Sequence, residues 1–207
     1  MQTPSLESLA QFNVSRESLD RLTILVQLLL DWQKHINLIA PSTIPDVWTR
    51  HVVDSLQLIP LIPAGVMAIA DLGSGAGFPA LVLAASQPAI VHMYEANAKK
   101  AAFLSEALRQ MKCVGVVHRE RLEPNMPPKN MPVVQLVTAR AFAPLPLLLS
   151  LAQPFMKTGA TALFHKGQDV DTELMESAKD WSLTSLKHSS VTDSQSVILE
   201  IKEMARV

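Results

Sequence analysis

The sequence contains a single cysteine, Cys113, among its 207 residues. One cysteine cannot form an internal disulfide bond or a site of several thiolate ligands, and the six histidines show no spacing typical of metal ligands. Long apolar runs are also missing. The apolar stretch 22–30 is interrupted by Gln27 and is far shorter than the roughly 18 residues of a transmembrane helix. The first residues lack the basic segment of a signal peptide. These absences predict a cytoplasmic protein with no bound metal and no membrane association.

The sequence also lacks an excess of charge of either sign. Lysine and arginine number 18 against 19 aspartates and glutamates, a net charge of −1. Any affinity for nucleic acid must therefore come from a local basic patch and not from the overall charge. Hydrophobic residues make up 48% of the chain, which is enough for a sizeable core, and the length suits one domain.

Three of the seven glycines lie in one stretch, Asp71-Leu-Gly73-Ser-Gly75-Ala-Gly77-Phe78-Pro79. An apolar strand expected at 66–70 leads into it, and a helix expected at 81–85 follows. Glycines in such a turn let a backbone approach a nucleotide closely, and the helix N-terminus offers free N–H groups. Phe78 stands where the dinucleotide-binding pattern G-x-G-x-x-G has its third glycine. The spacing resembles the S-adenosylmethionine loop of Rossmann-like methyltransferases, and the alternative is a glycine-rich turn without a ligand.

The rest of the chain predicts helices first and then alternating strands and helices. Ser15 is expected to cap a helix that ends near residue 35, and a second helix is expected from residue 42 or 43 to 58. Residues 1–62 would form a helical extension packed on a core of residues 63–207, in a single structural domain. Further strands are expected at 90–95, 114–118, 133–138, 161–165, 183–188 and 196–203, and helices at 98–111, 146–153 and 169–181. The first five strands predict a parallel, doubly wound sheet and the last two an antiparallel pair, while the proline-rich stretch 124–132 predicts no regular structure.

Ligands of such sheets bind at the carboxyl ends of the strands, which selects a small set of polar residues. Asp71 ends the first strand and would contact the ligand or the backbone of its own loop. Glu95 ends the second strand, near the distance from the loop at which a carboxylate accepts bonds from ribose hydroxyls. Phe78 would cover the ligand or belong to the core. Arg140 follows the fourth strand, and Lys100 lies in the first turn of a helix, where a cation opposes the helix dipole and so is expected to face an anion.

The segment Arg50-His51-Val-Val-Asp54-Ser55 places three polar side chains on one helical face. A Ser-His-Asp hydrolase would use these residue types, but positions on consecutive turns of one helix do not build a triad easily, and no G-x-S-x-G motif is present. We therefore expect His51 and Asp54 to shape or position a site, and not to form a hydrolase.

A series of short motifs lies between about residues 30 and 170. They are Asn37-Leu38, Arg50-His51-Val-Val-Asp54-Ser55-Leu56, Asp71 to Pro79, Lys99-Lys100 with Phe103-Leu104, Arg121-Leu122-Glu123, Arg140-Ala141 and Lys166-Gly167. In this order they resemble the RsmG (glucose-inhibited division protein B) family of bacterial 16S rRNA guanine-N7 methyltransferases. Gln135 and Ala139 depart from the family pattern on what we expect to be the substrate side.

The resemblance implies a Rossmann-like class I S-adenosylmethionine-dependent methyltransferase fold, with a mostly parallel seven-stranded sheet and an N-terminal helical extension. It implies S-adenosylmethionine as the cofactor, 16S rRNA or the small ribosomal subunit as the partner, and a monomer. The expected cofactor-binding residues are Asp71, Gly73, Gly75, Gly77, Phe78, Glu95, Leu122, Glu123 and Arg140. The expected catalytic residues are Arg140, Lys100, His51 and Asp54. A small-molecule methyltransferase and a non-catalytic cofactor- or RNA-binding module are the alternatives.

Overall fold

One seven-stranded sheet, in the order β3-β2-β1-β4-β5-β7-β6, organises the computed structural model, which describes residues 4–207. The strands are β1 (Ala68–Leu72), β2 (Ile90–Tyr94), β3 (Gly115–His118), β4 (Leu136–Arg140), β5 (Thr161–Lys166), β6 (Trp181–Ser189) and β7 (Val197–Arg206). Strands β1 to β5 pair in parallel, and β7 is antiparallel to both β5 and β6. The predicted mostly parallel sheet with a closing antiparallel pair is confirmed. Its strand order reverses between β1 and β4, which leaves a crevice at their carboxyl ends.

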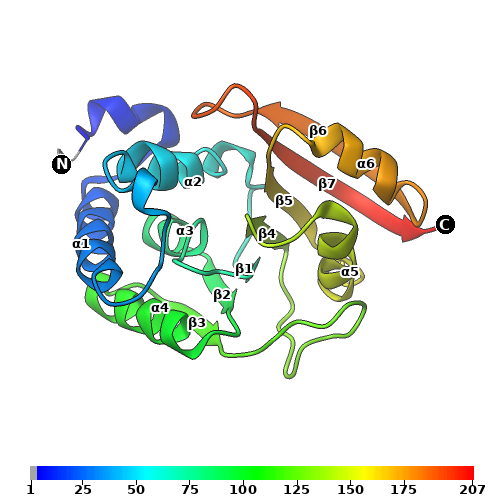
Figure 1. Cartoon of the computed structure of the whole chain (residues 1–207), viewed down its shortest axis with the longest axis horizontal. Helices are drawn as coiled ribbons and strands as arrows, with labels where there is room; N and C mark the ends of the chain where they lie inside the picture. Colours follow the sequence, from blue (N-terminus) through cyan, green and yellow to red (C-terminus); the bar gives the residue numbers. More distant parts are fainter. Residues whose placement is uncertain (1–3) are drawn as a thin grey trace.

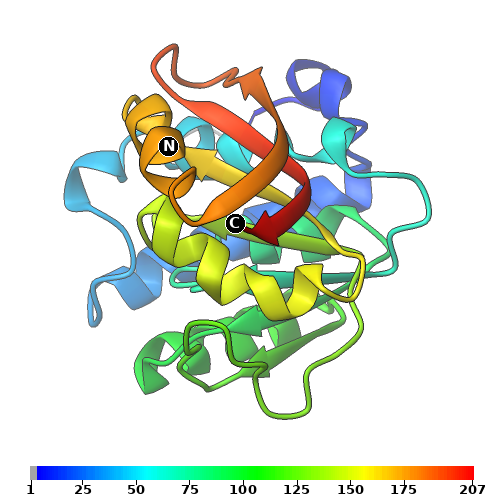
Figure 2. The same cartoon turned by 90° about the vertical axis from the view of Figure 1, so that its right-hand side faces the viewer.

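Helices cover both faces of this sheet (Figures 1 and 2). Alternate residues of a strand point to opposite faces, so Ile69 of β1 belongs to one hydrophobic core and Ala70 to the other. The first core includes residues of α1 (Arg16–Gln33), α3 (Ala80–Ser86) and α4 (Ala98–Met111). The second includes residues of α5 (Leu145–Met156) and α6 (Val170–Ser177). In Figure 2 the β6–β7 edge of the sheet and α5 are nearest the viewer, and the N-terminal helices lie farther back.

The helix starts that the sequence predicts are confirmed at two side-chain caps. The Ser15 hydroxyl accepts a hydrogen bond from the backbone N–H of Ser18 at 3.0 Å and begins α1. The Asn97 side chain accepts from the N–H groups of Lys99 and Lys100 and begins α4. Each cap satisfies N–H groups that have no partner within the helix.

The single helix predicted from residue 42 or 43 to 58 is wrong. That stretch forms η2 (Pro41–Thr43), the π-helix η3 (Trp48–Val53), the short α2 (Asp54–Leu56) and then η4 (Ile59–Leu61), after η1 (Glu7–Phe12) near the start of the chain. The carbonyl of Arg50, inside the π-helix, accepts a hydrogen bond from Arg140 of β4 at 3.1 Å. Such distant contacts are invisible to helical periodicity, and π-turns are frequent at functional sites.

Strands β1 and β4 begin and end two or three residues later than predicted, so Arg140 is the last residue of β4 and does not follow it. Two helix boundaries differ from the prediction for tertiary reasons. Helix α6 ends at Ser177, not near residue 181, because Trp181 opens β6 and is buried in the second core. Helix α5 continues through Pro154 to Met156, past the predicted end at 153, and both residues are buried.

Gln135, one of the departures from the family pattern, lies at the amino ends of the central strands β1 and β4, away from the crevice at their carboxyl ends. Gln135 lies just before β4, and its side-chain oxygen accepts hydrogen bonds from the backbone N–H groups of Met67 and Ala68, at the start of β1, at 3.1 and 2.9 Å. The expectation that Gln135 concerns the substrate side is therefore wrong. Within residues 4–207, no helix combines the length and the apolar character needed to cross a membrane.

Candidate active site

Two cavities lie along the carboxyl ends of the strands. The large cavity, of about 680 Å³, is lined by the loop 73–76, the end of β2 and the segment 120–124. The small cavity, of about 370 Å³, is lined by the ends of β4 and β5, by η3 and by the loop between β6 and β7. The residues that line both are His51, Arg140, Ala141, Phe142 and Ala143. The two cavities therefore share a wall at the end of β4.

The glycine loop gives the large cavity a wall of bare backbone. Gly73 has φ +68°, and a Cβ added there would lie 2.0 Å from Cδ2 of Phe142, so no other residue fits without moving that ring. The N–H of Gly75 donates to Oε2 of Glu95 at 2.9 Å, which fixes the loop against the end of β2. Gly73, Gly75 and Phe78 all line this cavity, where the sequence predicted a cofactor loop.

Glu95 joins the glycine loop to the first turn of α4. Its Oε1 atom accepts from the N–H of Asn97 at 2.7 Å, and its Oε2 atom takes the bond from Gly75. Each carboxylate oxygen can accept a second hydrogen bond, so Glu95 can also receive the two hydroxyls of a ribose. Leu122 and Glu123 line the same cavity and add an apolar surface and a second carboxylate. This set of groups fits S-adenosylmethionine, which carries a ribose, an apolar ring and a cationic sulfur.

Asp71 and Gly77, both expected to bind the cofactor, line neither cavity. Asp71 is 1% exposed and its Oδ1 atom accepts from the hydroxyl of Thr138 at 2.7 Å, which joins the ends of β1 and β4. Burial raises the pKa of Asp71 to about 6. A Cβ added to Gly77 would lie 2.3 Å from Leu81 of α3. The structure thus places both residues beneath the loop, where they support its shape.

Arg140 and His51 form the shared wall. The Arg140 guanidinium donates through Nη1 to Oδ2 of Asp54 at 2.8 Å, and its Nη2 lies 2.7 Å from Nδ1 of His51. The His51 ring stacks on Phe78 with 5.0 Å between ring centroids, and the Arg140 guanidinium lies over the same ring. Burial, with Arg140 nearby, lowers the pKa of His51 to about 4. His51 is therefore neutral at pH 7, accepts from Arg140 through Nδ1 and donates through Nε2 to the hydroxyl of Thr43 at 2.8 Å.

The hydrogen bonds of Ser55 exclude a Ser-His-Asp triad with His51 and Asp54. Its hydroxyl donates to the backbone carbonyl of His51 at 2.6 Å and not to the imidazole. Both ring nitrogens of His51 are engaged by Arg140 and Thr43. A Ser-His-Asp triad needs the serine hydroxyl on the imidazole, so these residues do not form one.

Asp54 is held by three side-chain donors, none of which the sequence indicated as its partner. Besides Arg140, the side chains of Gln57 and Thr192 donate to its Oδ1 atom at 2.8 and 2.7 Å. Thr192 lies on the β6–β7 loop, which reaches across to α2 in Figure 1. Burial by itself would raise the pKa of Asp54, but His165, Thr192 and Arg140 outweigh it and hold that pKa below its usual value. Asp54 is therefore ionised at pH 7.

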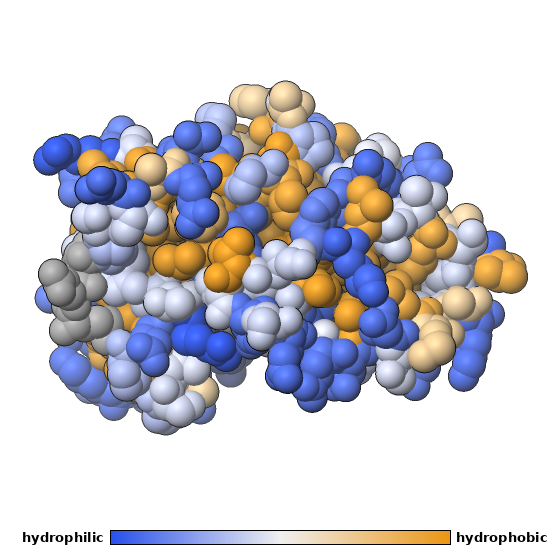
Figure 3. All heavy atoms as spheres, turned by 90° about the horizontal axis from the view of Figure 1, so that it is seen from above, coloured by the Kyte–Doolittle hydropathy of each residue, from blue (hydrophilic) through white to orange (hydrophobic). Residues whose placement is uncertain are grey.

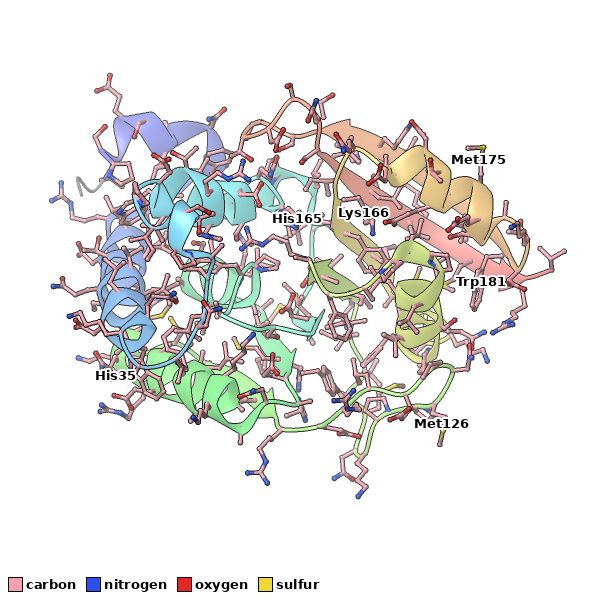
Figure 4. All side chains as sticks on the ribbon, in the orientation of Figure 1. His35, Met126, His165, Lys166, Met175 and Trp181 are labelled. Atoms are coloured by element: carbon pink, nitrogen blue, oxygen red, sulfur yellow. The ribbon has the colours of Figure 1, made fainter. Side chains whose placement is uncertain are left out.

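His165 and Lys166, at the end of β5, complete the small cavity and lie near the centre of the molecule in Figure 4. His165 donates through Nε2 to the backbone carbonyl of Asp54 at 2.7 Å, and burial lowers its pKa. Among residues 4–207, its Nδ1 atom has no hydrogen-bond partner. Lys166 forms an ion pair with Glu173 of α6. In the sequence, Lys166 belongs to one of the motifs of the family resemblance, whereas nothing there indicates His165.

Lys100, expected to act with Arg140, lies on the other side of the site. Lys100 and Arg121 both line the large cavity, and neither of them lines the small cavity. Within the described part of the chain, Lys99, Lys100, Arg119 and Arg121 form no ion pair. These cations are available for an anionic partner near the large cavity. No cluster of three or more metal-binding side chains occurs within residues 4–207.

A family model described as rRNA small subunit methyltransferase G (GidB) matches residues 18–201. The chain is 44% identical over 200 residues to the ribosomal RNA small subunit methyltransferase G of Paramagnetospirillum magneticum, which covers 97% of this chain and 96% of that relative. It is 50% identical over 198 residues to the protein of the same name from Bradyrhizobium sp. (strain ORS 278), covering 94% and 88%. A solved O-methyltransferase from Bacillus cereus in complex with SAH superposes with a TM-score of 0.54 at 14% identity, covering 86% of this chain and 90% of that one. The predicted class I methyltransferase fold is confirmed.

Proposed function

This chain belongs to the rRNA small subunit methyltransferase G family, and we propose that it transfers a methyl group from S-adenosylmethionine to N7 of a guanine in 16S rRNA. The observation that carries the proposal is the match to that family over nearly the whole chain. The lining of the large cavity supports it, because loop 73–76 and Glu95 offer the contacts that a ribose-bearing cofactor needs.

The large cavity is proposed to hold the cofactor. Glu95 accepts from the ribose hydroxyls, Leu122 supports the adenine, and Gly73 and Gly75 let the backbone approach closely. Asp71 and Gly77 contribute by shaping the loop and not by direct contact. When bound, S-adenosylmethionine supplies a methyl group whose bond to sulfur breaks as a bond to guanine N7 forms.

The acceptor chemistry requires no general base from the protein. Guanine N7 already carries a lone pair and no proton, so no proton leaves during the transfer. His51 is engaged on both ring nitrogens and Asp54 by three donors, which suits fixed positioning groups. The contribution of Arg140, His51 and Asp54 is then to hold a rigid polar wall beside the reacting atoms, a role based on orientation and electrostatics.

RNA is proposed to approach over the unpaired cations near the large cavity. Lys99 and Lys100 open α4, and Arg119 and Arg121 follow β3. Figure 3 shows the molecule from above the view of Figure 1, a different face, on which hydrophilic and hydrophobic residues are interspersed. Phosphates contacted by these side chains would make RNA binding fall steeply as salt rises.

The test is methylation of 16S rRNA and of 30S particles from cells that lack the enzyme, with tritiated S-adenosylmethionine. Label in 7-methylguanine at one nucleotide, identified by nucleoside mass spectrometry, is the expected result. The matched control is Glu95→Ala, which should bind the cofactor at least tenfold more weakly and label proportionally less at low cofactor concentration.

Two other outcomes would contradict the proposal. Cofactor binding by calorimetry without label in any rRNA would favour a non-catalytic module. Transfer to a small molecule with a KM that does not change with salt would favour a small-molecule methyltransferase, because such a substrate releases no counterions.

A further inference from the structure

The cations of the small cavity are all held in ion pairs, unlike Lys100 and Arg121 of the large cavity. Three cations line it, and each has a carboxylate partner: Arg140 with Asp54 at 2.8 Å, Arg50 with Asp193 at 3.5 Å, and Lys166 with Glu173. The two histidines in its lining have pKa values lowered by burial and are neutral at pH 7. By contrast, Lys100 and Arg121 in the large cavity have no carboxylate partner within the described residues. A phosphate group would require unpaired cations, so the small cavity suits a neutral polar group.

The shared wall carries an exposed aromatic ring. Phe142 is 39% exposed, whereas the other phenylalanines of the described residues are buried. One part of its ring covers Gly73, and Phe142 lines both cavities. Ala141, just before it, has φ +49°, a left-handed conformation that costs a non-glycine residue about 1–2 kcal/mol. The backbone is therefore strained at Ala141, the residue between Arg140 and Phe142.

The size and the lining of the small cavity also select its occupant. About 370 Å³ is enough room for a single base that has left the helix. Ser190, Asp193 and Ser196 of the β6–β7 loop add hydroxyl and carboxylate groups to its lining. A guanine presents two donors, N1–H and the N2 amine, and the acceptor O6, and therefore needs both kinds of partner.

We propose that the small cavity receives the target guanine as a single base turned out of the RNA, with the ring of Phe142 as its stacking surface. This inference rests on the proposed function and adds where the base binds and which side chain holds it. The base would enter from the β4–β5 side while the cofactor occupies the large cavity, so the two reactants would meet where the cavities adjoin, beside Arg140 and Phe142. Stacking on an aromatic side chain is the usual way in which proteins hold an unstacked RNA base.

The first experiment compares Phe142→Leu with the wild-type protein on 30S particles. Phe142→Leu should lower kcat/KM for the particles by about tenfold to a hundredfold, the usual loss for one base–aromatic stack. Phe142→Tyr, which keeps the ring, should recover most of that loss. Because Phe142 also lines the large cavity, kcat/KM for the particles is measured at saturating S-adenosylmethionine, so that a change in cofactor affinity does not enter the comparison. Met175→Ala, an exposed apolar truncation on α6 far from both cavities (Figure 4), is the matched control.

A second variant blocks the small cavity without touching the large one. Gly167 lines only the small cavity, and a Cβ added there would meet no atom within 4 Å. Gly167→Leu should therefore fold normally, bind the cofactor like the wild type and lose most methyl transfer. The slope of log KM against log salt should be the same for Phe142→Leu and for wild type, because a base contact releases no counterions.

The outcomes separate this inference from the proposed function. A wild-type protein that leaves 16S rRNA unmethylated would overturn both. A wild-type protein that methylates it, with Phe142→Leu equally active on the particles, would overturn the inference alone. A smaller salt slope for Phe142→Leu or Gly167→Leu would also overturn it, because that result would place a phosphate in the small cavity.

Discussion

The ion pair between Arg140 and Asp54 allows a quantitative test of how the wall is held. Both side chains are only 16% exposed, so removing one partner leaves the other charge buried without compensation. Breaking such a pair costs about 3–5 kcal/mol of unfolding free energy. After Arg140→Met, Asp54 would keep the donors Thr192 and Gln57. We therefore expect a loss near the lower end of that range, about 3 kcal/mol.

The matched variant removes the stranded charge as well. Arg140→Met/Asp54→Asn keeps an oxygen for the donors of Thr192 and Gln57 and has no buried carboxylate. Its unfolding free energy should lie about 1–2 kcal/mol below that of the wild type, which makes the double variant more stable than the single one. Both variants should lose methyl transfer to 16S rRNA, so the cycle separates stability from activity.

Urea unfolding at pH 7, followed by tryptophan fluorescence, measures these values. The slope against urea must be the same in all variants for the differences to report on the native state. A loss below about 1 kcal/mol for Arg140→Met, or a double variant no more stable than the single one, would refute the reasoning. Either result would mean that the pair is solvated in spite of its low exposure.

Three further predictions follow from single contacts. The pKa of His51 is lowered to about 4, so His51 makes the unfolding free energy rise with pH between about pH 4 and 6.5, by on the order of 3 kcal/mol, whereas Asp71, whose pKa is raised to about 6, makes it fall over much of that range. In urea titrations the difference between wild type and His51→Gln should therefore grow by that amount across the window, and a constant difference would contradict this. Gly73→Ala and Gly65→Ala should each lower the unfolding free energy by about 1–2 kcal/mol because both positions have a positive φ. Only Gly73→Ala displaces Phe142, so only this variant should bind S-adenosylmethionine more weakly in calorimetry, and equal binding by both variants would contradict this. Gln135→Ala should lower the unfolding free energy by about 1 kcal/mol, because two backbone N–H groups lose their acceptor, and should leave the rate of methyl transfer unchanged. A slower rate would show that the amino ends of the strands affect the site.

The sequence by itself determined the local elements and indicated the glycine loop and Glu95, which line the large cavity. A strand, a glycine turn and a helix follow one another within about 20 residues, and the capping residues Ser15 and Asn97 act on the N–H groups of their own helices. Glu95 could be located because it ends a strand at the expected distance from the loop. Each of these signals depends on neighbours in the chain, and so it can be read from order and spacing.

Only the tertiary structure decided how the two cavities share a wall. Thr192 binds Asp54 across 138 residues of sequence and Arg140 meets His51 across 89, and neither pair has a spacing that predicts it. Phe142 covers Gly73 because β4 pairs with β1 in one particular register. The same long-range contacts accompany the split of the helix predicted at 42–58. Such contacts arise from strand register and loop paths, which burial in three dimensions fixes and a linear pattern does not encode.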